Sequence, residues 1–456
     1  MRQKLKEFVF ANSEYSFINQ LKFYFPLICM AVILSSTGTF VNSALARLSQ
    51  PLVYISAFSV ANSFMTMFQS PLYMISPTIA SLADNANKYK QVRKFAVIIT
   101  LTVTCIMFIF RASGLTRAIF SNIFQLSGKT LNEAVKIFSV FILYPIGLFM
   151  KDFSQGVMIK FKKTWLMPVS SIIRVLTLIL FVVTVEHLTF IPTALLAGAI
   201  LICSLYTDAF TSLIGIKATV KNVPKAFEAQ SNLANEKPAN EVQGDTLTLS
   251  NVWRFYWPLI ITSFFHTLNS PIINASLGQT VDPDFTISTF SVAWGLCHLI
   301  SSPLTEFYQV PIGFMKADDS MSEVAVKRFA IFLGIIFTAL FLIIGFTGVG
   351  MHILTVLIGV EERVAHIANT MIKIATILPV LTVLIQYQTG VMMKNQTTKP
   401  LSKGKAINLI ALTLILLVSL LLGVENMAIG GIVATVCSYL AELTYLYFSR
   451  RYASSN

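Results

Sequence analysis

Charged residues are scarce in this chain. They make up 12% of its 456 residues, where a soluble protein carries about 25%. Hydrophobic residues make up 55%, and the mean hydropathy is +0.71. The apolar residues gather in blocks of about 18 to 25 positions, the length that a helix needs to cross a bilayer. This composition excludes an ordinary soluble globular protein and predicts a polytopic membrane protein.

Other absences narrow the class further. Long alternating strand patterns are missing, which favours helical spans over a β-barrel. The first apolar block has no small-residue cleavage site, so we expect a retained helix and no signal peptide. There is no Walker-type glycine loop, no metal-ligand spacing among the five cysteines and no nucleophile–base arrangement. We therefore expect no enzyme, no metal and no cofactor beyond a coupling H⁺ or Na⁺.

The apolar blocks predict an all-α fold with twelve transmembrane helices. We place them at residues 22–46, 52–82, 95–117, 134–159, 165–187, 191–216, 252–277, 285–315, 329–350, 364–392, 401–423 and 427–448. Residues 221–250 are polar and read as a solvated cytoplasmic linker. The predicted domains are thus an N-terminal six-helix bundle over 1–220, the linker 221–250 and a C-terminal six-helix bundle over 251–456.

Basic residues predict the orientation in the membrane. They cluster in 2–22, 88–94, 160–163, 316–328, 394–405 and 450–451, whereas the alternate loops carry acids such as Asp282 and Glu425. Because cytoplasmic loops are enriched in Lys and Arg, both termini should be cytoplasmic. The net charge of +13 then reflects topology and anionic lipid, without nucleic acid. We expect a monomer in a plasma membrane or bacterial inner membrane.

Five repeated phrases show that the chain is duplicated. FYFPLI at 23–28 returns as FYWPLI at 255–260, and FSVA at 58–61 and SPL at 70–72 return at the same offset of 232. At an offset of 234, RKFA (93–96) faces KRFA, and GVMIK (156–160) faces GVMMK. Repeats of six spans each begin on the same side, so they are parallel and predict two bundles around a central cavity, as in rocking transporters.

Three longer phrases resemble a known family. They are FYWPLIITSFFHTLNSPIINASLG (255–278), SSPLTEFYQVP (301–311) and LIGVEERVAHIANTMIKIATILPVLTVLIQYQTGVMM (357–393). They are similar to the second half of the progressive ankylosis protein family, within the multidrug/oligosaccharidyl-lipid/polysaccharide superfamily that includes the multidrug and toxin extruders (MATE). The resemblance implies a MATE-like fold and export of pyrophosphate, ATP or organic acids such as citrate. The chain departs from the family at Ser270 and Gln279, where the family has arginines. The family's Pro-Ser-Ser-x-x-Arg phrase, which is associated with its second half, appears in the first half of this chain and ends at Arg174. The corresponding position of the second half is Asn408.

Ionisable residues inside the spans are the candidates for transport chemistry, because they are costly in a membrane. Arg174 lies one helical turn from Ser170 and Ser171, and a guanidinium beside hydroxyls can grip a carboxylate or phosphate. The alternative is that Arg174 snorkels or pairs with Asp152. Lys151, next to Asp152, is a second candidate for binding the anionic substrate. Since neighbours on a helix point about 100° apart, these two need not pair.

A second set lies at matched or isolated positions. Glu306 is a lone carboxylate in span eight and is predicted, with Asp152, to couple or gate transport. Asn42 and Asn274 are matched across the repeat and are predicted to orient substrate, helped by Gln309 and Ser302. The alternative for both asparagines is hydrogen bonding between helices. Two further acids, Asp208 and Glu442, lie late in the last span of each half and are interpreted as interface anchors.

The sequence therefore predicts an alternating-access secondary transporter that exports a small anionic metabolite, such as an organic acid, pyrophosphate or a nucleotide-like compound. Two alternatives remain open: a cation-coupled multidrug antiporter and a lipid-linked precursor flippase. The charge of the site separates the anion exporter from the multidrug antiporter, because a positive cavity favours an anionic substrate and a negative cavity favours a cationic one.

Overall fold

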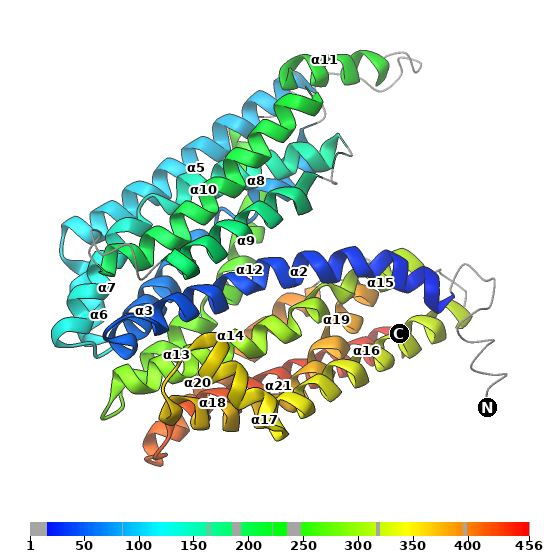
Figure 1. Ribbon diagram of the computed structural model, residues 1–456. Helices are drawn as coiled ribbons and strands as arrows, with labels where there is room; N and C mark the ends of the chain where they lie inside the picture. The colour runs from blue at the N-terminus through cyan, green and yellow to red at the C-terminus, as the bar shows by residue number, and fades with distance from the viewer. Residues whose placement is uncertain are drawn as a thin grey trace. The chain divides into compact units, whose positions relative to one another are not determined.

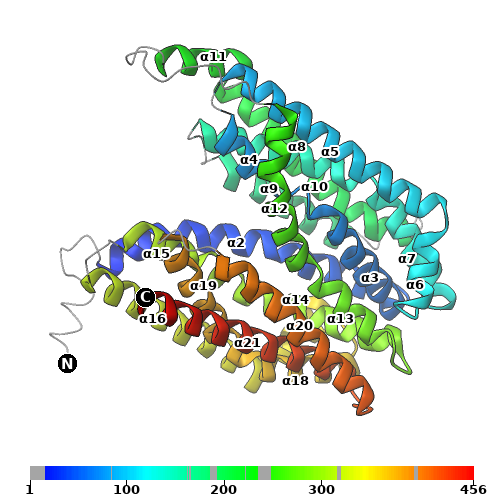
Figure 2. The same cartoon turned by 180° about the vertical axis from the view of Figure 1, so that it is seen from behind.

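The computed structural model describes residues 16–83, 85–161, 163, 166–184, 193–220, 222–234, 248–315, 320–394 and 399–455. All regular elements in these residues are helices (Figures 1 and 2). The chain divides into two compact units. Unit 1 comprises Met1–Ile55 and Ala275–Asn456, and unit 2 comprises Ser56–Asn274.

Unit 1 is built from α2 and the second half of the chain. Its elements are α2 (Phe17–Ala46), α14 (Pro283–Thr305), the 3₁₀ turn η2 (Glu306–Tyr308), α15 (Gln309–Phe314), α16 (Ser320–Phe346), α17 (Gly348–His352), the π-helical η3 (Ile353–Ile358), α18 (Glu362–Ile374), the 3₁₀ turn η4 (Ala375–Ile377), α19 (Leu378–Lys394), α20 (Lys399–Leu421) and α21 (Met427–Ser455). Helix α2 packs along α14, and α20 packs along α21.

Unit 2 holds the remaining elements. They are α3 (Pro51–Gln69, which begins in unit 1), α4 (Ile75–Leu82), α5 (Ala86–Ala112), α6 (Leu115–Asn122), α7 (Gly128–Phe141), α8 (Tyr144–Lys160), α9 (Leu166–Thr184), α10 (Thr193–Val220), α11 (Val223–Ala234), α12 (Leu249–Thr267) and α13 (Asn269–Leu277, which ends in unit 1). Helix α10 packs against both α8 and α9. The units therefore differ from the halves 1–220 and 251–456, because the first helix of each half belongs to the unit formed by the other half.

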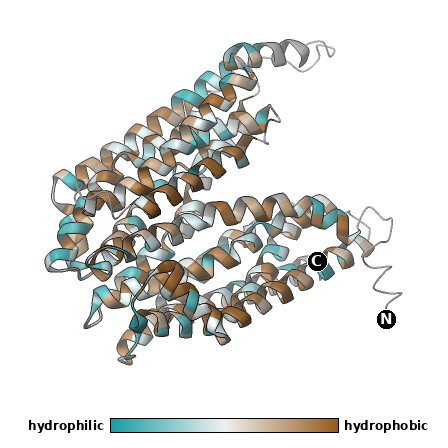
Figure 3. Cartoon of the chain, in the orientation of Figure 1, coloured by the Kyte–Doolittle hydropathy of each residue, from teal (hydrophilic) through white to brown (hydrophobic). Residues whose placement is uncertain are grey.

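The helices confirm a multi-pass membrane protein. Among the described residues, ten helices are long and apolar enough to cross a bilayer, or eleven if α7 and α8, bent by 41°, form one span. Apolar colour dominates most of these helices in Figure 3. The expected span at 252–277 is present as α12 and α13 but falls outside this set, since α12 carries Arg254 among its tryptophans and tyrosine.

Prolines break the second span of each half at matched places. Helix α3 ends just before Pro71, and α14 contains Pro303 shortly before it turns into η2. A proline leaves the carbonyl four residues earlier without its usual N–H partner. In both repeats the preceding serine fills that gap, because Ser70 and Ser302 each donate a hydrogen bond of 3.0 Å to this carbonyl. The repeated SPL phrase thus encodes a helix break with its polar groups satisfied.

The repeated aromatic phrase contacts the repeated proline phrase of the opposite half. The Tyr24 hydroxyl in α2 donates to the Pro303 carbonyl at 2.5 Å within unit 1, and the Tyr256 hydroxyl in α12 donates to the Pro71 carbonyl within unit 2. Each pair of residues is related to the other by the offset of 232. The two phrases recur together because each unit needs one copy of both.

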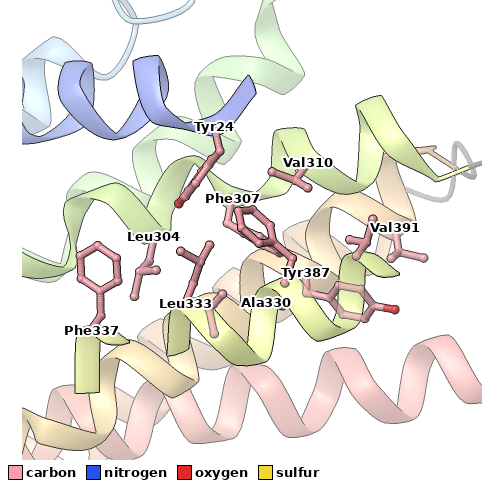
Figure 4. Close-up of a cluster of buried hydrophobic side chains, with 12 residues drawn as sticks. Tyr24, Leu304, Phe307, Val310, Ala330, Leu333, Phe337, Tyr387 and Val391 are labelled. Carbon is pink, nitrogen blue, oxygen red and sulfur yellow. The ribbon is translucent and has the colours of Figure 1, made fainter. Parts of the chain in front are cut away.

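Tyr24 is also a fully buried member of the core of unit 1. Its ring packs edge-on against Phe307 at 5.7 Å and against Phe329 at 5.9 Å. Figure 4 shows Tyr24 reaching from α2 toward Phe307. The same buried cluster contains Leu304, Val310, Val326, Ala330, Leu333, Phe337, Val383, Tyr387 and Val391. Since lipid is as apolar as these side chains, close packing is what holds such helices together.

We expect Tyr24→Phe to lower the free energy of unfolding by about 1 to 2 kcal/mol, because it leaves the buried Pro303 carbonyl without its donor. Thermal unfolding in detergent checks this. Phe25→Leu is the control, since Phe25 is an exposed neighbour on the same helix. Equal midpoints for Tyr24→Phe and wild type would show that the hydroxyl carries no stability.

The described part of the linker is ordered by an aromatic contact. Residues 223–234 form α11, whose Phe227 is buried and stacks on Tyr89 of α5 at 4.7 Å and against Phe161 at 4.8 Å. This polar segment therefore docks through one aromatic side chain while Lys225 and Glu228 stay exposed, and a solvated linker over 221–250 stays a prediction. Residues 235–247 lie outside the described part.

Candidate functional site

Four ionisable side chains come together in unit 2 from three neighbouring helices. Lys151 and Asp152 lie on α8, Arg174 on α9 and Asp208 on α10. Asp152, Arg174 and Asp208 are buried, with exposed fractions of 6%, 7% and 0%. Helix α10 packs against both other helices and so brings the four groups together. We call these residues the unit 2 charge cluster.

Arg174 pairs with Asp208. Its Nη1 lies 3.8 Å from Oδ2 of Asp208, near the limit for an ion pair. Within the described residues, Nε of Arg174 and both carboxylate oxygens of Asp208 have no hydrogen-bond partner. Arg174 therefore forms its ion pair with Asp208 and not with Asp152, and Asp208 lies within the bundle. The pair is loose, and the guanidinium retains donor capacity.

Lys151 and Asp152 form the second pair of the cluster. Nζ of Lys151 lies 3.4 Å from Oδ1 of Asp152, so adjacent residues on one helix do pair here. The flexible lysine stem lets the ammonium bend back toward its neighbour. Asp152 also interacts electrostatically with Asp208 and Arg174, which joins the two pairs into one network. The four formal charges sum to zero, so net charge alone does not select a cation or an anion.

The hydroxyls expected to assist Arg174 are used elsewhere. Ser170 and Ser171 both donate to the backbone carbonyl of Met167, at 3.0 and 3.1 Å. These bonds inside α9 satisfy the serines without the guanidinium. A different polar pair borders the network: the Tyr73 hydroxyl donates to Oε1 of Gln69 at 2.5 Å, and Tyr73 interacts electrostatically with Asp152 and Arg174.

Unit 1 carries a related pair at the matched position. Glu442 corresponds to Asp208 at the offset of 234, and it is buried in a 2.7 Å ion pair with Lys405. Arg174 corresponds to Asn408, so the cation of unit 1 lies three residues earlier in the helix. Sequence reasoning missed both pairings. The signal was available, because two acids at matched positions in the last span suggest a shared requirement.

Glu306 lies where α14 gives way to the 3₁₀ turn η2. Its Oε2 accepts a 2.8 Å hydrogen bond from Nε2 of Gln309, so these two predicted site residues contact each other. Tyr24 and Tyr308 interact electrostatically with the carboxylate. Ser302 contacts the Ser35 hydroxyl at 2.7 Å in addition to the carbonyl that its proline frees.

Asn42 and Asn274 make the same contact in different units. Nδ2 of Asn42 donates to the carbonyl of Ser291 at 3.2 Å, and Nδ2 of Asn274 donates to that of Ser59 at 3.1 Å. The serine hydroxyls lie 3.3 Å away in both cases. All four positions obey the offset of 232. The amide nitrogens thus serve helix packing, and contact of these residues with substrate stays a prediction.

The structure places the predicted residues in two groups. Lys151, Asp152, Arg174 and Asn274 belong to unit 2, and Asn42, Ser302, Glu306 and Gln309 to unit 1. Over the described ranges, no cluster of three or more His, Cys, Asp or Glu side chains could hold a metal ion.

Comparison with a family model identifies one family. The model of the progressive ankylosis protein (ANKH) matches residues 7–284, which is more than half of the chain. The match covers the first half and the phrase at 255–278, whereas the phrases at 301–311 and 357–393 lie beyond it.

Solved structures share the fold at low sequence identity. A MATE-family multidrug resistance transporter of the MOP superfamily in an inward-facing conformation has a TM-score of 0.63 at 11% identity, covering 94% of this chain and 95% of that one. The lipid II flippase MurJ has a TM-score of 0.56 at 13% identity, covering 93% and 87%. A MOP superfamily transporter from Pyrococcus furiosus has a TM-score of 0.53 at 13% identity, covering 94% and 95%. These similarities confirm the MATE-like fold.

Proposed function

Because the chain belongs to the progressive ankylosis protein family, we propose that it is a secondary transporter that exports a small anionic metabolite by alternating access. One observation carries the proposal. The buried guanidinium of Arg174 comes no closer than 3.8 Å to the carboxylate of Asp208 and keeps an unused Nε donor. A well-satisfied structural arginine would make closer contacts, often bidentate ones, to its carboxylate. The substrate class is an organic acid, pyrophosphate or a nucleotide-like compound.

The other residues have supporting roles in this proposal. Lys151 lies in the same charge network as Arg174 and supplies the second positive charge for a polyvalent anion. Asn42, Asn274, Gln309 and Ser302 orient the substrate. Glu306 and Asp152 couple transport to an ion gradient or gate it, since carboxylates in a bilayer can bind H⁺ or Na⁺. The protein works in a plasma or bacterial inner membrane with both termini cytoplasmic.

The acids favour a second candidate, a cation-coupled multidrug antiporter. Both oxygens of Asp208 lack a hydrogen-bond donor among the described side chains and backbone groups, and such a carboxylate would attract a drug cation. The fold that the chain shares with a multidrug transporter is compatible with this candidate. The fold that it shares with MurJ is equally compatible with a lipid-linked precursor flippase. The Pyrococcus furiosus transporter of the same fold is described as having a binding pocket of reverse polarity that suggests a different function, so the charge of the pocket differs among proteins with this fold.

Flux into proteoliposomes tests the proposal. Labelled citrate, pyrophosphate and ATP would be compared with a cationic dye, under imposed H⁺ and Na⁺ gradients, with empty liposomes as the control. We expect anion flux well above that of empty liposomes. Dye flux without anion flux would overturn the proposal in favour of the antiporter.

The same assay tests the role of Glu306. Glu306→Gln preserves the size of the side chain but removes its charge, so we expect anion flux that no longer responds to the ion gradient. Thr305→Ser, at the preceding position, is the matched control and should respond as wild type does. An unchanged gradient response in Glu306→Gln would assign coupling to another residue.

A further inference from the structure

We infer that Asp208 is a proton site of the transporter and takes up one proton when an anion binds Arg174, so that anion and proton are bound together. The inference rests on the proposed function, because it uses Arg174 as the anion site. It assigns a role to a residue of α10 that none of the sequence motifs singled out for transport. The proton comes from the water on the side from which the anion enters.

The first step is the state of the pair without substrate. Asp208 has an exposed fraction of 0%, and its carboxylate lies 3.8 Å from the nearest guanidinium nitrogen. Neither of its oxygens accepts a hydrogen bond from the described part of the chain. The carboxylate therefore offers Arg174 a charge but no good hydrogen bond. An anionic ligand that fits the guanidinium closely can displace it.

The second step is the charge left behind. Once an anion compensates Arg174, the carboxylate of Asp208 stays buried without its cation, and a buried unpaired charge costs several kcal/mol. The other cation of the cluster, Lys151, is already 3.4 Å from Asp152. Protonation of Asp208 removes the cost by converting the carboxylate into a neutral acid. One proton is bound for each anion, and no other bond changes.

The surroundings of Asp208 support this assignment. The elements packed against α10 are α7, α8, α9 and α11. Helix α8 contributes Lys151 and Asp152, and α9 contributes Arg174. Two other elements also carry charges. Helix α7 carries Lys129 and the pair of Glu133 and Lys136, which lie 3.0 Å apart, and α11 carries the exposed Lys225 and Glu228. Asp152 on α8 is the second carboxylate of the cluster, and it is already paired with Lys151 at 3.4 Å.

The inference predicts a specific pH dependence of binding. If one proton accompanies each anion, the affinity falls about tenfold for each unit of rise in pH. Asp208→Asn is neutral at every pH and leaves Arg174 without its competitor. This variant should bind the anion at least about tenfold more tightly near pH 8, with the slope reduced by one proton.

The experiment is calorimetric titration of the purified protein in detergent with citrate, from about pH 7 to about pH 8.5, where citrate itself changes charge little. Glu442→Gln is the matched control, because it neutralises the acid at the equivalent position of unit 1. We expect wild type and Glu442→Gln to share one slope and Asp208→Asn to lose it. A slope in Asp208→Asn equal to that of the control would overturn the inference.

A second measurement needs no variant. Adding pH-matched citrate to weakly buffered wild-type protein should raise the pH of the solution by the amount of proton taken up, one per citrate bound. Binding without proton uptake would overturn the proton site while leaving the anion transporter intact. Failure of wild type to bind citrate, pyrophosphate or ATP at any pH would instead overturn the proposed function, and the inference with it.

Discussion

Arg174→Ala should reduce anion flux in proteoliposomes by about two orders of magnitude, the effect of losing a charged contact worth roughly 3 kcal/mol. The guanidinium is the buried cation with an unused donor in the unit 2 charge cluster. Alanine provides neither charge nor hydrogen bonds for a carboxylate or phosphate. Lysine restores the charge without the planar fork, so Arg174→Lys should recover only part of the flux.

The single variant alone is ambiguous, because it leaves Asp208 as an uncompensated buried charge that is itself destabilising. The double variant Arg174→Ala/Asp208→Asn removes both charges and should recover most of the lost thermal stability. Its anion flux should remain absent, which separates binding from folding. Lys405→Ala breaks the related pair of unit 1 and should retain wild-type flux per folded molecule. Anion flux in a well-folded double variant would show that Arg174 is not the anion site.

The fold could be predicted from the sequence because its two strongest constraints are local. Apolar blocks of sufficient length define the spans, and collinear repeated phrases define the duplication. The membership of the units could not be predicted in this way. A hydrogen bond such as that from Tyr24 to Pro303 joins residues 279 positions apart, and the offset of 232 is equally compatible with Tyr24 contacting the proline of its own half. Tertiary packing decides between these arrangements.

The candidate site likewise has features that the local sequence reveals and features that depend on tertiary packing. Arg174 and Lys151 were identifiable because a charge within an apolar block is visible in the sequence itself. The partner of Arg174 was not, since Asp152 and Asp208 both lie on neighbouring helices, and the rotation of each helix decides which one the guanidinium meets. The hydrogen bonds that Ser170 and Ser171 make within their own helix could not be predicted for a related reason. A serine in a helix can satisfy itself on the preceding turn, and spacing alone does not reveal this.

A matched pair of glycines shows what the repeat requires of side-chain size. Gly156 and Gly390 open the phrases GVMIK and GVMMK. A Cβ built on Gly156 would lie 2.8 Å from the carbonyl oxygen of Ser76, and one on Gly390 would lie 2.4 Å from that of Tyr308. Ser76 and Tyr308 are themselves matched at the offset of 232. In both units, therefore, the fourth span lies directly against the backbone that follows the proline break.

Gly390→Ala should accordingly destabilise the protein by about 3 kcal/mol or more, the upper part of the range for overpacking a close-packed interior. The clash is with backbone and with Pro311, which lies 2.8 Å from the same Cβ, so no flexible side chain can move aside. Gly156→Ala should cost less, because its clash is milder. Gly38→Ala is the control, since Gly38 lies in α2 with nothing within 4 Å of its Cβ position. The fraction of monodisperse protein after detergent extraction, with thermal midpoints for each variant, gives the order. If Gly390→Ala matched Gly38→Ala, the close approach of α19 to the break would be disproved, and the structural basis of the repeated phrase with it.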